Sequence, residues 1–288
     1  MNNFYEGKII SIDPSITEVK DDAFSVELDE QENYILKLYI ADPITNNETL
    51  IEQITGNKLN FEDSSNTFSV KSALRKYSLS SRQEQKCFCF EFKISPSGRL
   101  LKFYYGKQKV KIDYELTYDD VVDAIDQEEE LYEFFCKISE LSNVLYSKRN
   151  AGAEFQTYSS KIDYDFTFPR EFTVLLNILL AEHFHSCYIP FIYDVEEYDK
   201  YKNHMKFWYY TSTPTKTITE KNLEGYYYGA FTSPLQNFED LKNLEIFNDF
   251  MVKDYSDEER ETLKKIYTSQ LTGYKRMKEE RQLNTRRK

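Results

Sequence analysis

The segment SIDPSITEVKDDAFSVELD, Ser11 to Asp29, places three carboxylates between two strand-like runs. The first run ends at Asp13. The second, Ala23 to Asp29, alternates apolar and polar side chains with the two-residue period of a half-buried strand. The polar stretch between the runs is rich in turn formers, so Asp21 and Asp22 open the second strand. The segment therefore predicts two adjacent strands with acidic side chains at the turn that joins them.

The neighbouring sequence extends this pattern into a sheet. GKIISID (7–13) and YILKLYIAD (34–42) read as strands, and CFCFEFKISPSGRLLKFYYG (87–106) reads as a hairpin with its turn at Pro96 to Gly98. Strands joined by such short connections pair in antiparallel fashion. We therefore expect an antiparallel sheet that continues past residue 85.

Helical periodicity dominates the later parts of the chain. Apolar residues recur at three- and four-residue steps over 117–145, the segment 170–188 is apolar enough to be largely buried, and 257–282 is charged and amphipathic. A short helix is predicted at 47–54. Because strands and helices form separate blocks, the prediction is an α+β fold with an antiparallel sheet packed by several helices. No Gly/Ser linker interrupts the chain, so residues 1–288 are predicted to form a single domain.

The composition limits the partners of the chain. With 37 Lys and Arg against 49 Asp and Glu, the formal net charge is -12, and the overall field repels polyanions. An RNA contact would need a local patch or bound cations. The basic concentration found in the sequence is the C-terminal YKRMKEERQLNTRRK (274–288), which reads equally well as a solvated helix end.

The cysteines and the hydropathy pattern indicate a cytoplasmic protein. Cys87, Cys89, Cys136 and Cys187 have no paired spacing, which favours reduced thiols over a disulfide framework. No segment holds about 18 uncharged apolar residues in succession, and the start of the chain lacks the basic and apolar parts of an export signal. We therefore expect no association with a membrane.

Two interpretations of Asp13, Asp21 and Asp22 follow from the residues alone. A turn that carries several carboxylates can fold them around a hard cation, and Mg²⁺ combines one or two carboxylates with water and substrate phosphate. Acidic residues at strand ends are also common without any ligand. Spacing alone leaves both interpretations open.

The order of several motifs adds to the metal interpretation. Ile12-Asp13, followed by Asp21-Asp22-Ala23-Phe24-Ser25-Val26 and then Tyr39 to Pro43, resembles the catalytic motif of the ribonuclease II and ribonuclease R (RNB) family. Further segments resemble later parts of the family in the same order: 72–100, the buried helix at 174–184, and YYTSTPTKTITEKNLEGYYYGAFTSPLQNFEDL at 209–241. The resemblance covers most of the chain.

The resemblance implies a magnesium-dependent 3′→5′ exoribonuclease that shortens single-stranded RNA. By the same likeness, Asp13, Asp21 and Asp22 would hold Mg²⁺ or Mn²⁺, with Asp21 and Asp22 as catalytic residues. Ser233, Gln236 and Glu279 would support the site. A metal-bound water would attack the terminal phosphodiester, and an Arg would stabilise the charge on phosphate.

The departures from the family pattern raise an alternative. A fourth family aspartate corresponds to Val19, which cannot coordinate a cation, and the family Arg corresponds to Gln236. Losing one electrostatic donor of this kind costs about 10²-fold in rate or more. The RNA-gripping OB modules that usually flank the family domain are not expected in this chain, so a protein partner would have to replace them. The alternative is therefore a catalytically inactive module that binds RNA, another RNA-linked substrate or a protein.

Other candidate ligands carry less weight. His183, His185 and Cys187 are spaced two residues apart on an expected helix, which points their side chains in different directions. We expect them to pack rather than to bind a metal. The aromatic segments at 207–210 and 224–231 fit base stacking, but with aromatic residues at 16% of the chain they fit core packing better.

Overall fold

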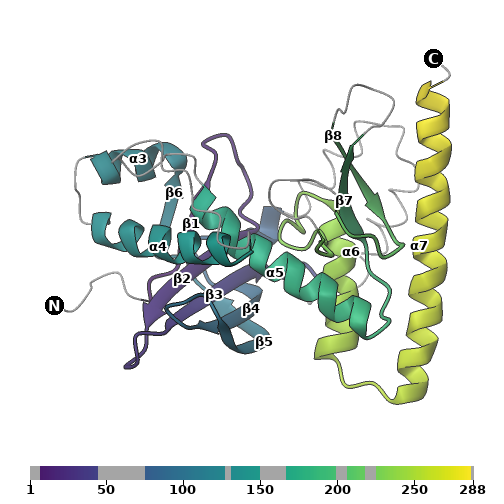
Figure 1. Cartoon of the computed structure of the whole chain (residues 1–288), viewed down its shortest axis with the longest axis horizontal. Coiled ribbons are helices and arrows are strands. Elements are labelled where there is room, and N and C mark those ends of the chain that lie inside the picture. The colour runs from purple at the N-terminus through teal and green to yellow at the C-terminus, as the bar shows by residue number, and fades with distance from the viewer. Residues whose placement is uncertain are drawn as a thin grey trace. The chain divides into compact units, whose positions relative to one another are not determined.

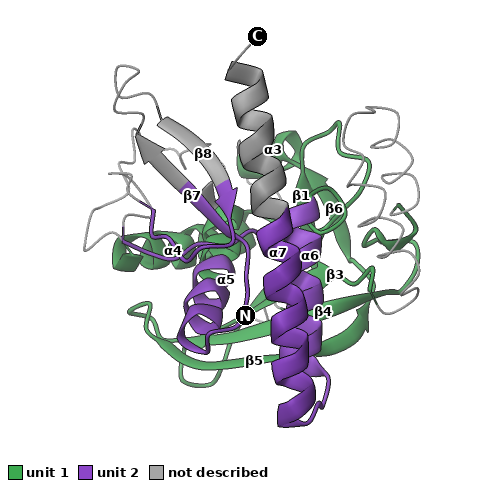
Figure 2. Ribbon diagram, turned by 90° about the vertical axis from the view of Figure 1, so that its right-hand side faces the viewer, with its two compact units in different colours: residues 1–175, 232–237 green, residues 176–231, 238–288 purple. Residues whose placement is uncertain are grey.

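The computed structural model describes residues 7–44, 75–126, 131–149, 167–198, 206–217 and 225–286, and gives the backbone alone for 126, 167–168, 196–198, 206–209 and 274–286. The chain divides into two compact units (Figure 2). Unit 1 comprises residues 1–175 and 232–237, and unit 2 comprises 176–231 and 238–288. Whether the two units act as the predicted single domain stays a prediction.

Unit 1 is built on a six-stranded sheet with the order β5-β4-β3-β2-β1-β6 (Figure 1). The strands are β1 (Ile10–Asp13), β2 (Asp22–Leu28), β3 (Tyr34–Ala41), β4 (Gln85–Ile94), β5 (Leu100–Val110) and β6 (Tyr114–Thr117). The five strands from β5 to β1 pair in antiparallel fashion, as the sequence predicts. The predicted strands and the 87–106 hairpin are therefore confirmed.

The sixth strand is a difference from the predicted sheet. β6 pairs with β1 in parallel, and Asp13 lies opposite Thr117. The sheet is therefore mixed within an α+β fold. The pairing joins residues about a hundred positions apart, so it could not be predicted from a local turn sequence.

One face of this sheet forms the core of unit 1. Phe88, Phe90 and Phe92 of β4 are fully buried, and Phe24 of β2 meets Phe172 edge to face at a centroid separation of 5.4 Å. Phe172 lies on α5 (Thr167–Ser186), the buried helix that the sequence predicts. Because side chains alternate between the two faces of a strand, the phenylalanines of β2 and β4 lie on the same face of the sheet, the face that contacts α5 through Phe24.

Two helices occupy the range that the sequence predicts as one. α3 (Tyr118–Asp126) and α4 (Tyr132–Arg149) lie on either side of residues 127–130, which are outside the described ranges. The buried ion pair between Arg149 and Glu171, with Nη2 2.6 Å from Oε1, ties the end of α4 to the start of α5. The short 3₁₀ turn η1 (Arg75–Tyr77) also belongs to unit 1. The helix predicted at 47–54 lies outside the described residues.

Unit 2 combines the second half of α5 with a hairpin and further helices. These elements are β7 (Tyr193–Tyr198), β8 (Lys206–Thr211), α6 (Phe238–Phe247), the π-turn η2 (Asn248–Val252) and α7 (Asp257–Arg286). The buried Asn243 amide accepts from Ile192 N–H and donates to the carbonyls of Ile192 and Ala230. One side chain therefore joins α6 to the chain before β7. α7 confirms the predicted C-terminal helix.

Close packing at Gly229 gives a testable prediction for unit 2. A Cβ at Gly229 would overlap Cε1 of the fully buried Phe191 ring, so Gly229→Ala should lower the free energy of unfolding by about 1 to 3 kcal/mol. Gly273→Ala is the matched control because its Cβ meets nothing within 4 Å on α7, and helix propensity should make it about 1 kcal/mol more stable. Urea denaturation of both variants checks the opposite signs. Equal stability of the two variants would contradict this packing.

The described helices contain no span that is both long and apolar enough to cross a bilayer. The cytoplasmic location stays a prediction.

Candidate functional site

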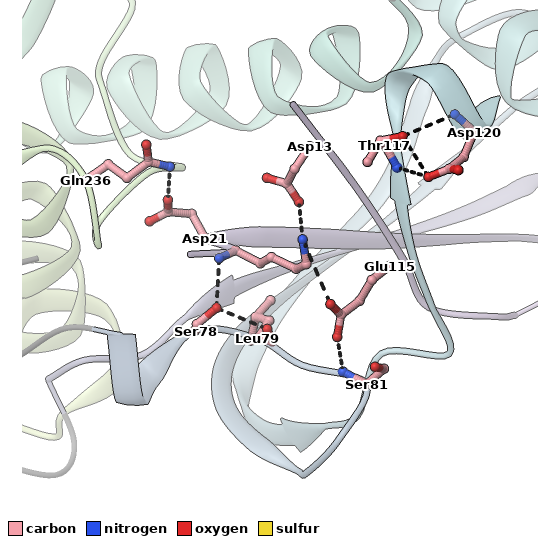
Figure 3. A network of polar contacts seen from close by, with 10 residues as sticks. Asp13, Asp21, Ser78, Leu79, Ser81, Glu115, Thr117, Asp120 and Gln236 are labelled. Carbon is pink, nitrogen blue, oxygen red and sulfur yellow. Dashed lines mark hydrogen bonds and ion pairs between the residues drawn. The ribbon is translucent and has the colours of Figure 1, made fainter. Parts of the chain in front are cut away.

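The acidic turn lies at the end of the sheet where β1, β2 and β6 meet. Asp13 is the last residue of β1, and Asp21 directly precedes β2. The connecting turn is closed by the Thr17 N–H, which donates to the Pro14 carbonyl at 2.8 Å. Figure 3 shows Asp13 and Asp21 projecting into the same polar region. The predicted strand, turn and strand are thus confirmed, together with the position of the carboxylates between them.

Asp21 is held by a segment far away in sequence. Its Oδ1 accepts the Leu235 N–H at 2.6 Å, and its Oδ2 accepts Gln236 Nε2 at 2.6 Å. Residues 232–237 belong to unit 1, and the Gln236 N–H donates in turn to the Ser233 carbonyl at 3.1 Å. The Thr-Ser-Pro-Leu-Gln segment therefore forms a turn that presents two hydrogen-bond donors to one carboxylate.

Burial makes Asp21 an unusual acid. The residue is 1% exposed, and this desolvation raises the pKa of its carboxyl to about 7. The hydrogen bonds from Gln236 and Leu235 lower the pKa, and the nearby charge of Asp13 raises it. Desolvation is the largest of these effects, so the fold keeps a carboxyl where ionisation is costly.

Asp13 is paired with a lysine from its own turn. Lys20 Nζ lies 3.5 Å from Asp13 Oδ2 and 4.0 Å from Glu115 Oε2. Burial raises the pKa of Asp13, and the Lys20 charge lowers it. The Lys20 backbone N–H donates to Ser78 Oγ at 2.8 Å, and Glu115 accepts the Ser81 N–H at 2.5 Å (Figure 3). The ammonium group is thus positioned between two carboxylates.

Asp22 lies near the other two acids. It is half-buried at the start of β2, where the register sets it opposite Ile40. Burial raises the pKa of Tyr118, and the charges of Asp13 and Asp22 raise it further. Since Asp13 also acts on Asp21, all three carboxylates lie within one electrostatic neighbourhood.

This arrangement differs from a preformed metal site. Among the described residues, no group of three or more His, Cys, Asp or Glu side chains is arranged to hold a metal ion. A divalent cation beside Asp13 would be repelled by the Lys20 ammonium, and at Asp21 it would compete with two donors. Val19, at 6% exposure, packs in the core. The ligand roles of Asp13, Asp21 and Asp22, and the identity of the cation as Mg²⁺ or Mn²⁺, stay predictions.

The remaining predicted residues are distributed between the two units. Ser233 lies in the turn that carries Gln236, where its carbonyl accepts the N–H groups of Gln236 and Asn237. Glu279 lies on α7 in unit 2, and its side chain is outside the described part of the structure. The supporting roles of Ser233, Gln236 and Glu279 stay predictions.

Of His183, His185 and Cys187, only His185 packs as expected, because His183 near the end of α5 and Cys187 directly after it are exposed. The His185 ring lies 4.0 Å from the Tyr227 ring, centroid to centroid, while His183 Nε2 is 3.8 Å from Cys187 Sγ. The two histidines thus have different neighbours, which is how side chains two positions apart on a helix are expected to lie.

Sequence reasoning missed two members of this network, Lys20 and Glu115. Lys20 stands between Val19 and Asp21, and the motif of the turn is defined by its acids and does not include this position. Glu115 is in β6, which carries no motif and reaches the site through its parallel pairing with β1. A cation placed inside an acidic turn is the signal that could have revealed Lys20.

Comparison with known families gives a match over more than half of the chain. Residues 70–225 match the family model described as RNB domain, which is more than half of the chain. The matched range begins after Asp13, Asp21 and Asp22, so it leaves their roles untested. No curated protein matches the sequence.

Several solved structures share the fold. Mycoplasma genitalium RNase R, in complex with ribose-methylated single-stranded RNA, is 14% identical with a TM-score of 0.69 over 93% of this chain and 55% of its own. The active-site mutant of the Dss1 exoribonuclease from Candida glabrata is 15% identical, with a TM-score of 0.64 over 93% of this chain and 45% of its own. Yeast Ssd1, a pseudonuclease, is 12% identical, with a TM-score of 0.62 over 93% of this chain and 42% of its own. The chain therefore spans about half the length of these proteins, and such low identities show a common fold alone.

Proposed function

Because the chain belongs to the RNB family, we propose that it is a catalytically inactive member that binds single-stranded RNA without cleaving it. The observation that carries this proposal is the pairing of Asp13 with the Lys20 ammonium inside the acidic turn. A protein cation already neutralises the carboxylate that a family nuclease would offer to a metal. The fold would then supply an RNA-binding surface whose hydrolytic chemistry is lost.

The chemistry of cleavage supports this choice. When bound, Mg²⁺ would activate water and stabilise the charge that builds on phosphate. Of the residues present, Asp13, Asp21 and Asp22 would be its ligands. In this chain Lys20 instead holds Asp13, and Gln236 donates to Asp21 from the position of a family arginine. A neutral amide cannot stabilise a developing negative charge as a guanidinium does.

The second candidate is an attenuated Mg²⁺-dependent 3′→5′ exoribonuclease. It is favoured by the effect of the Asp13 charge on Asp21, by the nearness of Asp13 and Asp22 to Tyr118, and by the raised pKa of Asp21. Acids kept buried at such a cost are found often at catalytic sites. Both exoribonucleases and a pseudonuclease occur among the proteins of similar fold, so the fold accommodates either candidate.

A paired binding and cleavage assay tests the proposal. Fluorescently labelled single-stranded RNA is first titrated with the full chain in EDTA, and anisotropy should report binding that weakens as salt rises. The same RNA is then incubated with the chain in Mg²⁺ or Mn²⁺, beside RNase R as an active control. We expect intact RNA with this chain and shortened RNA with RNase R.

Two outcomes would overturn this proposal. Absence of RNA binding would remove the proposed activity. Metal-dependent shortening that is lost in Asp21→Asn but kept in Asp119→Asn, an exposed α3 carboxylate, would establish the second candidate instead. If the chain binds no RNA, another RNA-linked substrate or a protein partner in place of OB modules would be sought.

A further inference from the structure

The β4–β5 hairpin is basic within an acidic protein. Residues 85–110 carry six Lys or Arg side chains and one acid, Glu91, whereas the whole chain has a net charge of -12. Among the described residues, Arg99, Lys102 and Lys109 are exposed cations with no ion pair. Lys93 and Lys107 are instead paired with Asp29 and Asp42. A local excess of positive charge therefore remains along β5.

Two tyrosines of the same strand are exposed to solvent. Tyr104 is 53% exposed and Tyr105 is 39% exposed, and they are adjacent members of the small set of exposed large apolar side chains in the described residues. Elsewhere the sheet buries its aromatic side chains: Phe88 and Phe90 on the neighbouring strand are fully covered. Because successive strand residues point to opposite faces, Tyr105 lies on the face of Phe90 and Tyr104 on the face of Glu91. The exposed ring on the face of Lys102 is therefore Tyr104 alone.

The sheet register gives Tyr104 an open flank. β5 is an edge strand in the described sheet and pairs with β4 on one side. Tyr104 lies opposite Glu91, and Gly106 follows two residues later on the same face. A Cβ at Gly106 would meet nothing within 4 Å, so there is space beside the tyrosine. Lys102 lies on the other side of Tyr104 along the strand, which places a cation, a ring and a gap in one row.

We propose that this row, defined by Lys102, Tyr104 and Gly106, is a contact surface for single-stranded RNA. The inference rests on the proposed function, since it names where RNA would bind. Tyr104 would stack on a base and Lys102 would contact a phosphate, a combination that binds single strands with little sequence preference. Across the sheet β5 is four strand spacings, about 19 Å, from β1, the strand that ends at Asp13.

Edge protection accounts for part of this surface. Lysines on an edge strand hinder pairing with another sheet, and Lys102 and Lys109 serve that purpose whatever else they do. Edge protection requires no exposed aromatic rings, so it leaves Tyr104 unexplained. An acidic protein segment could also pair with the lysines. It would gain less binding energy than a nucleic-acid base from contact with the flat Tyr104 ring and the open space beside it. The ring and the charge together favour RNA.

Variants of the full chain test the surface by RNA anisotropy. Tyr104→Thr keeps a strand former and removes the ring, and it should weaken binding about 5-fold to 100-fold. Gly106→Ile fills the gap with a strand-forming side chain and should weaken binding similarly. The matched controls are Tyr188→Asn, which removes another exposed ring, and Lys265→Gln, which removes an exposed α7 cation; neither should change affinity more than about 2-fold.

The salt dependence provides a second, independent measurement. Lys102→Gln should reduce the slope of log K against log salt by about 0.7, since each phosphate contact to a single strand contributes about that amount. Thermal unfolding of every variant confirms that the fold is retained.

The outcomes separate this inference from the proposed function. If the wild-type chain binds RNA while the β5 variants match their controls, the β5 surface is refuted and the proposed function stands. If the wild-type chain binds no RNA, both are refuted. If polyglutamate displaces RNA as well as unlabelled RNA does, the surface is an acidic-protein site and this inference is overturned.

Discussion

Lys20→Met should lower the free energy of unfolding by about 2 kcal/mol near pH 8, between the cost expected for an exposed and for a buried ion pair. The side chains of Lys20 and Asp13 are 17% and 12% exposed, so removal of the ammonium leaves a poorly hydrated carboxylate without its partner. Methionine fills nearly the same volume, which limits the change to the charge. Urea denaturation in EDTA measures the loss.

The matched control for this variant is Lys37→Met. Lys37 also lies between two carboxylates, with Nζ 3.3 Å from Glu27 Oε1 and 3.5 Å from Glu91 Oε2, but these groups are more exposed. Solvent screening should keep its cost within about 1 kcal/mol. A larger loss in Lys37→Met than in Lys20→Met would show that the Asp13 pair has no special role.

Magnesium should distinguish Lys20→Met from the wild-type chain. Removing the ammonium leaves Asp13 and Glu115 facing a region without a cation, so added Mg²⁺ should stabilise the variant, by about 2.7 kcal/mol when it reaches about 100 times its Kd. The wild-type chain should gain little. Equal stabilisation of both would mean that the acidic turn binds the metal despite Lys20, and would favour the nuclease.

Asp21→Asn should raise the free energy of unfolding near neutral and alkaline pH. The pKa of Asp21 is raised from 3.8 to about 7 by burial, so at about pH 8 the folded chain carries a desolvated charge that costs about 4 kcal/mol relative to the unfolded chain. Asparagine keeps the shape without the charge. Its carbonyl can accept the Leu235 N–H, and the Gln236 amide can turn so that its oxygen accepts from the new NH₂ group.

The sign of the pH dependence follows from the raised pKa. A carboxyl whose folded pKa exceeds its unfolded pKa stabilises the fold at low pH, and this contribution is lost as pH rises from about 4 to about 7. The stability advantage of Asp21→Asn over the wild-type chain should therefore shrink by about 2 to 3 kcal/mol between about pH 8 and about pH 5. Urea denaturation in EDTA at both pH values measures it.

Asp119→Asn serves as the control because Asp119 is exposed on α3. Its effect should stay within about 0.5 kcal/mol at both pH values. An advantage of Asp21→Asn that does not vary with pH would contradict the assignment of a buried, costly charge. If Mg²⁺ reverses the order, so that wild-type Asp21 becomes the more stable, the carboxylate is a metal ligand.

Local patterns in the sequence determined most of the strands and helices of this protein. The two-residue alternation in β2 and β4 and the turn at Gly98, whose φ is +75°, are encoded by neighbouring residues. The apolar run of α5 likewise required only its own periodicity. These features could be predicted because each depends on side chains a few positions apart.

Only part of the candidate site could be predicted from the sequence. The acids Asp13, Asp21 and Asp22 and the substitution at Gln236 could be identified by motif, but their electrostatic environment could not. Burial of Asp21 results from chain packing, and its donors come from a turn more than two hundred residues away. A pKa depends on this three-dimensional surrounding.

The sequence by itself determined the α+β class, the RNB family resemblance and the three acids of the turn. The tertiary structure decided that Lys20 lies between Asp13 and Glu115, that β6 completes the sheet in parallel, and that Tyr104 lies exposed on an edge strand. The physical reason is that periodicity and turn chemistry act over a few residues, whereas charge pairing, strand order and exposure arise when distant segments are brought together.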